Sequence, residues 1–85
     1  MTEPLHRLPL TQLDYRLIWW LLGEQVIERG VPTGTVRSGW RTRALRELGC
    51  SRISLWESQR RLLKHGIVVF KPWQRNLRIC GEAFT

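Results

Sequence analysis

The sequence predicts a mainly α-helical domain with a small β-hairpin. Two helical patterns lie on either side of a short turn that contains Gly49, and two strand-like runs, 67–70 and 77–80, follow them. A longer apolar helical pattern comes first. Eighty-five residues suffice for one hydrophobic core. The expected order within a single domain of residues 1–85 is an N-terminal arm (1–10), a first helix (11–29), a helical pair (42–65) and a hairpin (67–80).

The first helix is delimited by its end signals. Thr11 and Asp14 have the spacing of a capping pair, so the helix should start directly after Thr11. Gly30 favours the left-handed conformation that ends many helices, and Pro32 cannot continue one. The sequence therefore predicts a helix that ends at Arg29.

This first helix has more apolar surface than one core contact requires. Beside a leucine-rich side, a second apolar stripe recurs at helical spacing, namely Tyr15, Trp19, Leu22 and Val26. A helix that is apolar nearly all round is buried on more than one side. Because a domain this small has little chain left to cover the second stripe, we expect the stripe to form a homodimer interface. A core helix that its own chain wraps more completely is the alternative.

The segment 31–41 reads as a linker, because it contains one proline and two glycines between helical patterns. Within it, 35–37 is a candidate short strand. Thr42 is the expected N-cap of the brief helix that follows, and Gly49 is its expected end.

The helix after the turn has two clearly different sides. Ser51 is a good N-cap, because its hydroxyl can accept an amide proton of the first helical turn. Leu55 and Leu62 fall nearly on one line, with Ser58 close beside them, and predict the inner face. The other side and its flank carry Arg52, Ile53, Trp56, Arg60 and Lys64. Gly66 predicts the helix end, and an arginine-rich helix of this kind suits a DNA major groove.

The net charge of +7 is unevenly distributed along the chain. Residues 37–78 carry eleven basic and two acidic side chains, a net charge of +9, whereas residues 1–36 carry three basic and four acidic ones. Positive charge concentrated in this way usually faces a polyanion. An arginine-rich surface that is only solvated is the alternative.

The segment 51–68 also matches a known pattern. The matching positions are Ser51, Arg52, Ser54, Leu55, Ser58, Leu62, Gly66, Ile67 and Val68. The segment thereby resembles the recognition segment of winged helix-turn-helix domains in bacterial transcription regulators, particularly the GntR-like group, which reads S-R-x-T-V-R-x-A-L-x-x-L-x-x-x-G-L-[IV]. Trp56 stands where that pattern has an arginine, and Gln59 where it has a leucine. The resemblance covers roughly residues 12–80, but only this segment matches residue by residue.

The resemblance implies a winged helix-turn-helix fold that binds DNA. In that geometry Arg52 and Ile53 meet base edges, and Trp56 and Arg60 lie close by. Arginines near the preceding helix are expected to contact DNA phosphates. The tip of the hairpin is expected to follow the DNA backbone or to enter the minor groove. The expected DNA-binding residues are therefore Arg41, Arg43, Arg46, Ser51, Arg52, Ile53, Trp56, Arg60, Lys71, Arg75 and Asn76.

Motifs for catalysis or metal binding are missing from the sequence. His6, His65, Cys50 and Cys80 have no zinc-site spacing, and the seven acidic side chains show no catalytic arrangement. Two cysteines are too few for a disulfide framework, and the apolar run 17–22 is far shorter than a membrane span. We therefore expect a cytoplasmic protein that is not an enzyme and has no cofactor, metal or small-molecule ligand.

The expected function is that of a sequence-specific repressor that binds double-stranded DNA as a dimer on an inverted-repeat operator. By the resemblance it would be a small stand-alone regulator of the plasmid or phage type. The alternative is a winged-helix module that docks on protein in a replication or conjugation assembly, with tryptophans as anchors. Five tryptophans in this length keep that alternative open, whereas the charge distribution favours DNA. RNA is a weaker third option, because no aromatic pair on a predicted strand suggests base stacking.

Overall fold

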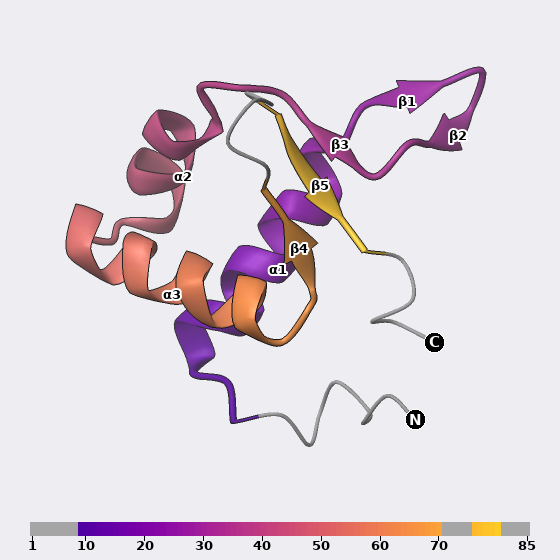
Figure 1. The fold of residues 1–85 in the computed structure, drawn as a ribbon. Helices are drawn as coiled ribbons and strands as arrows, with labels where there is room; N and C mark the ends of the chain where they lie inside the picture. The colour runs from indigo at the N-terminus through magenta and orange to yellow at the C-terminus, as the bar shows by residue number, and fades with distance from the viewer. Residues whose placement is uncertain (1–8, 71–75, 81–85) are drawn as a thin grey trace.

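The computed structural model describes residues 9–70 and 76–80, which form three helices and two small antiparallel sheets (Figure 1). The elements are α1 (Gln12–Glu24), β1 (Ile27–Glu28), β2 (Val31–Pro32), β3 (Thr35–Val36), α2 (Trp40–Leu48), α3 (Arg52–Lys64), β4 (Val68–Val69) and β5 (Leu77–Ile79). A helix-rich fold with small β elements is what the sequence predicts. In the described part of the chain, no helix has the length and apolar character that a bilayer span requires.

α1 begins where the sequence predicts. The Thr11 hydroxyl accepts a hydrogen bond from the Asp14 amide at 3.2 Å, and the Asp14 carboxylate accepts one from the Thr11 amide at 2.9 Å. These two bonds satisfy two of the amides that every helix start leaves without an intrahelical partner. The predicted end at Arg29 is wrong, because α1 ends at Glu24.

Gln25 is the residue that turns the chain away from α1. Its backbone is extended, its side-chain amide donates to the Leu22 carbonyl at 3.0 Å, and its side-chain oxygen accepts from the Gly34 amide at 3.0 Å. The Val26 amide then donates to the Thr35 carbonyl at 2.8 Å. These bonds to a segment further along the chain replace the helical continuation, and nothing in the local sequence signals them.

β1 and β2 form a hairpin that projects from the rest of the molecule (Figure 1). Its turn residues Arg29 and Gly30 have φ values of 52° and 78°. Positive φ at both central residues is typical of the two-residue turns whose twist matches that of paired strands. Gly30 therefore serves a hairpin turn and not a helix end. Ile27 and Val31, one on each strand, are exposed.

The second sheet has the order β3–β5–β4, with both pairings antiparallel. Val36 lies opposite Leu77, and Val68 lies opposite Ile79, so four buried apolar side chains line one face. The predicted strand within 35–37 and the predicted pairing of the last two strands are confirmed. The connection between β4 and β5 falls at 71–75, outside the described residues.

α2 begins earlier than the sequence predicts. Its first residue is Trp40, and Gly39 precedes it with a φ of 84° and no side-chain cap, so the predicted cap at Thr42 is wrong. The reason is burial. The Trp40 side chain is completely enclosed in the core, and this packing favours a helix that already includes Trp40. The helix ends as predicted at Gly49, which has a φ of 64° and donates its amide to the Leu45 carbonyl.

α3 follows α2 after three residues, and its predicted ends and inner face are confirmed. The Ser51 hydroxyl accepts from the Ser54 amide at 3.1 Å and caps the helix. Leu55 and Leu62 are buried, as is Ser58. Gly66 follows the helix with a φ of 71°, which suits a glycine after a helix end.

One apolar core joins the three helices to the three-stranded sheet. Trp40 lies at its centre, with its ring centroid 6.4 Å from that of the partly buried Trp20. The buried apolar residues are Leu17, Ile18, Leu21, Val36, Trp40, Ala44, Leu55, Leu62, Ile67, Val68, Leu77 and Ile79. Because every helix contributes to this set, loss of any one helix would open the core.

A buried carboxylate ties α1 to α3. Asp14 is fully buried, and it accepts a hydrogen bond from the Ser58 hydroxyl in addition to its bond from the Thr11 amide. Arg61 donates to the two carboxylate oxygens from Nε at 2.7 Å and from Nη2 at 3.0 Å. Asp14 therefore has a second role beyond the helix cap, which the sequence pattern did not predict.

The surroundings of Asp14 keep its carboxyl group ionised. Burial alone raises the pKa of Asp14, but the hydrogen bonds from Arg61, Ser58 and Thr11 and the positive charge of Arg61 together outweigh burial, so the pKa lies below its usual value of 3.8. The carboxylate thus contributes stability that is fully present above pH 3.8. This stability is lost as the pH falls through the lowered pKa of the folded state.

Asp14→Asn should therefore lower the free energy of unfolding by about 2–3 kcal/mol near neutral pH, since Arg61 loses its ionic partner. Urea unfolding followed by tryptophan fluorescence measures this change. The difference from the wild type should shrink as the pH falls below 3.8, where the wild type also loses its buried charge. Glu24→Gln is the control, because the pair between Glu24 and Arg43 is long, at 3.7 Å, and partly exposed. Equal losses of unfolding free energy in the two variants would contradict the stabilising role of the Asp14 carboxylate.

Candidate functional site

The outer side of α3 presents both charged and large apolar side chains. Ile53 is 72 % exposed and Trp56 is 56 % exposed, so two large apolar side chains lie in solvent one turn apart on this helix. The exposed residues of the helix are Arg52, Ile53, Trp56, Glu57, Arg60, Leu63 and Lys64. The predicted outer face of the helix is therefore confirmed, and its apolar residues lie mainly in the first two turns.

Trp56 and Arg60 form a pair on this outer face. They are one helical turn apart, and the guanidinium carbon of Arg60 lies 4.8 Å from the Trp56 ring centroid. A cation over an indole face is attracted by the negative charge of the ring's π-system. The contact leaves the guanidinium charged and holds it beside the exposed ring.

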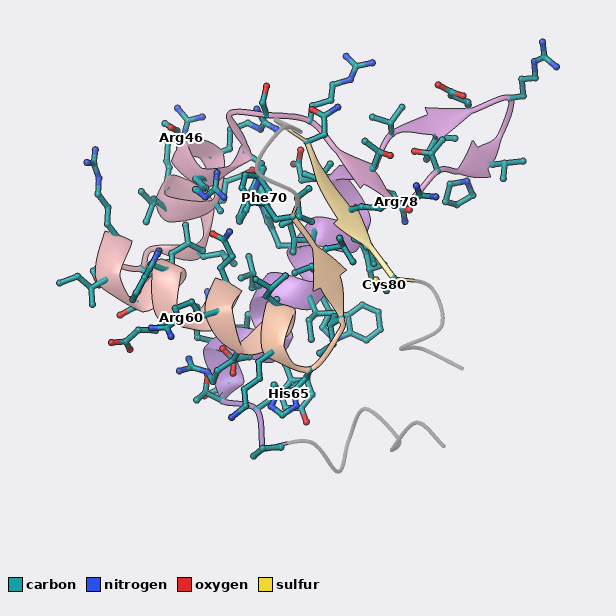
Figure 2. All side chains as sticks on the ribbon, viewed as in Figure 1. Arg46, Arg60, His65, Phe70, Arg78 and Cys80 are labelled. Carbon is teal, nitrogen blue, oxygen red and sulfur yellow. The ribbon has the colours of Figure 1, made fainter. Side chains whose placement is uncertain are left out.

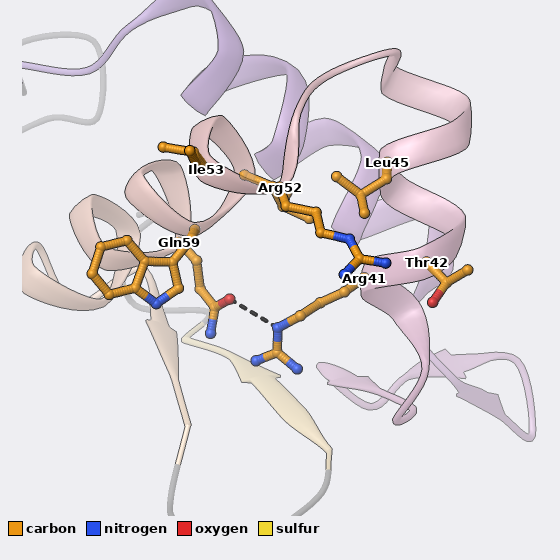
Figure 3. A pocket seen from close by; sticks show the side chains of 8 residues that line it. Arg41, Thr42, Leu45, Arg52, Ile53 and Gln59 are labelled. Carbon is orange, nitrogen blue, oxygen red and sulfur yellow. Dashed lines mark hydrogen bonds between the residues drawn. The ribbon is translucent and has the colours of Figure 1, made fainter.

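A groove of about 470 Å³ separates α3 from α2 (Figure 3). Its lining residues are Arg41, Thr42, Leu45, Arg52, Ile53, Leu55, Trp56 and Gln59. Both helices contribute, and the walls are largely apolar with two arginines among them. Thr42 and Leu45 were not expected at the site. Their helical spacing on α2 is the sequence signal that places them on one side of that helix.

Arg41 lies at the junction of α2, α3 and the sheet. Its Nε donates to the Gln59 side-chain oxygen at 3.0 Å, as Figure 3 shows. Its guanidinium carbon is 4.8 Å from the Trp40 ring centroid and 5.1 Å from that of Phe70. Partial burial lowers the pKa of Arg41, but the arginine side chain stays charged. Arg41 has no carboxylate within ion-pair distance among the described residues.

Gln59 thus bonds to Arg41 at a position where the winged-helix pattern that this segment resembles has a leucine. A leucine there could pack against the groove but could not bond to a guanidinium. The amide of Gln59 instead compensates part of the desolvation of Arg41. The bond fixes α2 against α3 on the side where the groove opens.

The other expected DNA-binding arginines on α2 differ in their surroundings. Arg43 forms an ion pair with Glu24 at 3.7 Å, so its charge is partly compensated. Arg46 is exposed and lies with Arg60 on the side of the molecule away from the β1–β2 hairpin (Figure 2). Ser51 is exposed, but its hydroxyl is already used by the helix cap.

The expected wing contacts are only partly described. Lys71 and Arg75 lie outside the described residues. Asn76 is exposed, and its side-chain oxygen accepts from the Ser38 amide at 3.0 Å, so it ties the start of β5 to the loop before α2. Arg78, the exposed middle residue of β5, was not among the expected residues. Arg78 lies between two buried apolar residues, and this alternation in the sequence could have identified it as an exposed residue of the strand.

The expected dimer stripe on α1 is not continuous. Val26 lies beyond the end of α1, so its assignment to this helical stripe is wrong. Tyr15 and Leu22 are half-buried and pack against the core of the same chain. Trp19 alone among the four is highly exposed, at 71 %. The chain thus wraps α1 more completely than the dimer prediction assumed, and self-association through Trp19 stays a prediction.

A comparison of the chain with protein-family models, curated proteins and solved structures gives no match. The groove, the exposed α3 residues and the charge distribution are therefore the basis for a functional proposal. In the described part of the chain, no three histidine, cysteine, aspartate or glutamate residues gather in a way that could hold a metal ion.

Replacing Gln59 with leucine tests the role of the Arg41 contact. Gln59→Leu should lower the free energy of unfolding by about 1 kcal/mol, because the Arg41 Nε loses its partner while it stays half-buried. Thermal unfolding measures the change. Arg41→Met in the Gln59→Leu background should cost less than Arg41→Met alone, since the two residues share one interaction. Additive losses would show that the bond contributes nothing.

Proposed function

We propose that this chain is a sequence-specific DNA-binding protein of the winged helix-turn-helix type, with α3 as the helix that enters the major groove. The exposed face of α3 carries the proposal. It combines arginines with large apolar side chains that have no place in the core of the chain. A helix with such an exposed face fits the width of the major groove, where base edges offer hydrogen-bond acceptors and methyl groups.

The order of the elements supports this fold assignment. Without the β1–β2 hairpin the chain reads α1, β3, α2, α3, β4 and β5, with β5 central in its sheet. The three-residue connection between α2 and α3 contains Gly49, as helix-turn-helix motifs often do. The β1–β2 hairpin is an addition between α1 and β3.

The distribution of charge supports DNA as the partner. Residues 37–78 carry a net charge of +9, and both acidic residues of this segment have positive or donor groups nearby. Glu47 accepts a hydrogen bond from the Trp20 indole at 2.8 Å, and Glu57 lies near Arg61. The exposed arginines Arg46, Arg52 and Arg60 form no ion pair with a carboxylate in the described part of the chain. Positive potential of this kind attracts phosphates.

A repressor that works by occupying its operator needs only such a DNA-binding surface. We propose that role for this protein, with two copies on an inverted repeat as its working form. Trp19 is the residue whose exposure supports contact between copies. A bulky exposed indole favours a partner surface over water.

A protein partner is the second candidate function. The apolar groove between α2 and α3, with Trp56 on its wall, supports it, because exposed tryptophans often anchor protein interfaces. The arginines around the groove favour DNA over an apolar peptide. The two candidates differ in salt dependence, which is steep only for binding to phosphates.

Binding to duplex DNA should be specific and strongly dependent on salt. If about six phosphates are contacted, the logarithm of the association constant should fall against the logarithm of salt concentration with a slope near −5. Selection from random duplexes followed by fluorescence anisotropy measures both properties. Arg52→Ala should cost about 1–3 kcal/mol and relax discrimination at one base pair.

Arg29→Asn is the matched control for Arg52→Ala. Arg29 is an exposed cation on the β1–β2 hairpin, away from α3, and asparagine tolerates its positive φ. The control should therefore keep the sequence preference of the wild type. Equal affinity for all sequences, or an affinity that does not respond to salt, would refute DNA recognition.

The dimer prediction is tested by replacing the exposed tryptophan of α1. Trp19→Glu should yield a folded monomer, because the substitution adds charge to the contact without touching the core. Sedimentation velocity measures the association state. Trp56→Glu is the control, since it places the same change on α3 and should leave the dimer intact. A wild-type monomer at micromolar concentration contradicts the dimer, and a dimeric Trp19→Glu protein moves the interface elsewhere.

A further inference from the structure

Ile53 occupies an exposed position that folding does not explain. It is the second residue of α3, it is 72 % exposed, and it lines the groove between α2 and α3. An isoleucine in this place loses the stabilisation that burial would give. A serine or lysine would serve a solvated helix start equally well. The side chain therefore points to a ligand that offers an apolar group.

We propose that Ile53 recognises the C5 methyl group of a pyrimidine in the major groove. This inference rests on the proposed function, in which α3 enters that groove. Base edges there present hydrogen-bond donors and acceptors, and the C5 methyl of thymine is the apolar group among them. A 5-methylcytosine carries the same group at the same ring position. The common ligand is thus a C5-methylated pyrimidine.

The walls of the groove suit a methyl-bearing base edge. Leu45 and Trp56 line the groove together with Ile53, so an apolar group at Ile53 meets apolar surface from both helices. Trp56 is itself 56 % exposed, and Arg60 is held over its ring. A methyl group seated against these side chains would remove further apolar surface from water.

The charges around Ile53 select a nucleic acid over an apolar peptide. Arg52 precedes it and is exposed, and Arg41 lies on the same groove without a carboxylate partner in the described part of the chain. An uncharged peptide bound there would place these two cations next to a ligand that cannot compensate their positive charge. Phosphates and guanine acceptors on either side of a methylated pyrimidine would balance both.

Uracil substitution isolates the methyl group, because uracil pairs like thymine and lacks only that group. Each thymine of the selected duplex is replaced in turn by uracil, and the affinity of the full chain is measured by fluorescence anisotropy. At one or two positions the wild type should bind about fourfold more weakly, the factor expected for one exposed methyl. In Ile53→Ala that penalty should disappear at the same position.

Two further variants connect the penalty to Ile53. Ile53→Val keeps a branched apolar side chain and should retain a reduced uracil penalty. Arg52→Ala should bind more weakly overall but retain the full penalty, because it removes a neighbouring contact and not the apolar one. Circular dichroism should show all three variants folded, since neither position contributes to the core.

The outcomes separate this inference from the proposed function. Specific binding with no uracil penalty at any position overturns methyl recognition and leaves DNA binding intact. A penalty that persists unchanged in Ile53→Ala also overturns it, since another residue would then read the methyl. Absence of specific DNA binding overturns both. At the sensitive position the thymine–adenine pair is then exchanged for a cytosine–guanine pair with and without a C5 methyl on the cytosine. A gain of a similar factor on methylation identifies any C5-methylated pyrimidine as the ligand, and no gain restricts the ligand to thymine.

Discussion

The buried carboxylate of Asp14 is the interaction on which the arrangement of the helices depends. A carboxylate without partners in this position would be very unfavourable, so Thr11, Ser58 and Arg61 must all be in place when the core closes. Thr11 belongs to the start of α1, and the other two residues belong to α3. The contact therefore selects one rotation of α3 about its axis. With Ser58 turned inward, Ile53 is left on the outside.

A second polar contact, between Arg41 and Gln59, connects the two walls of the groove between α2 and α3. Arg41 reaches from α2 to the Gln59 amide of α3 and lies near the rings of Trp40 and Phe70. These contacts join both helices to the end of β4. The charge of Arg41 is held at the groove without a carboxylate among the described residues. A fixed cation beside apolar walls is well suited to a ligand that has phosphates near apolar groups, which is the property that the proposed function requires.

Most errors of the sequence-based prediction occur where long-range contacts overrule local signals. Thr11, Gly49 and Ser51 were placed correctly, because each acts within one helical turn of its own position. α1 was predicted too long, since the bonds of Gln25 to a segment nine residues ahead have no local pattern. α2 was predicted to start too late, because the burial of Trp40 in the core depends on residues that are distant in the sequence.

The sequence by itself determined the starts of α1 and α3, the turn between α2 and α3, the charge concentration and the outer face of α3. Spacing and composition suffice for these features, because helix caps and helical periodicity depend on near neighbours. Only the tertiary structure decided which polar side chains pair across different helices. Arg61 binds a carboxylate 47 residues away, and Arg41 binds an amide 18 residues away. Such pairs depend on how the helices pack, and packing is settled by the whole core together.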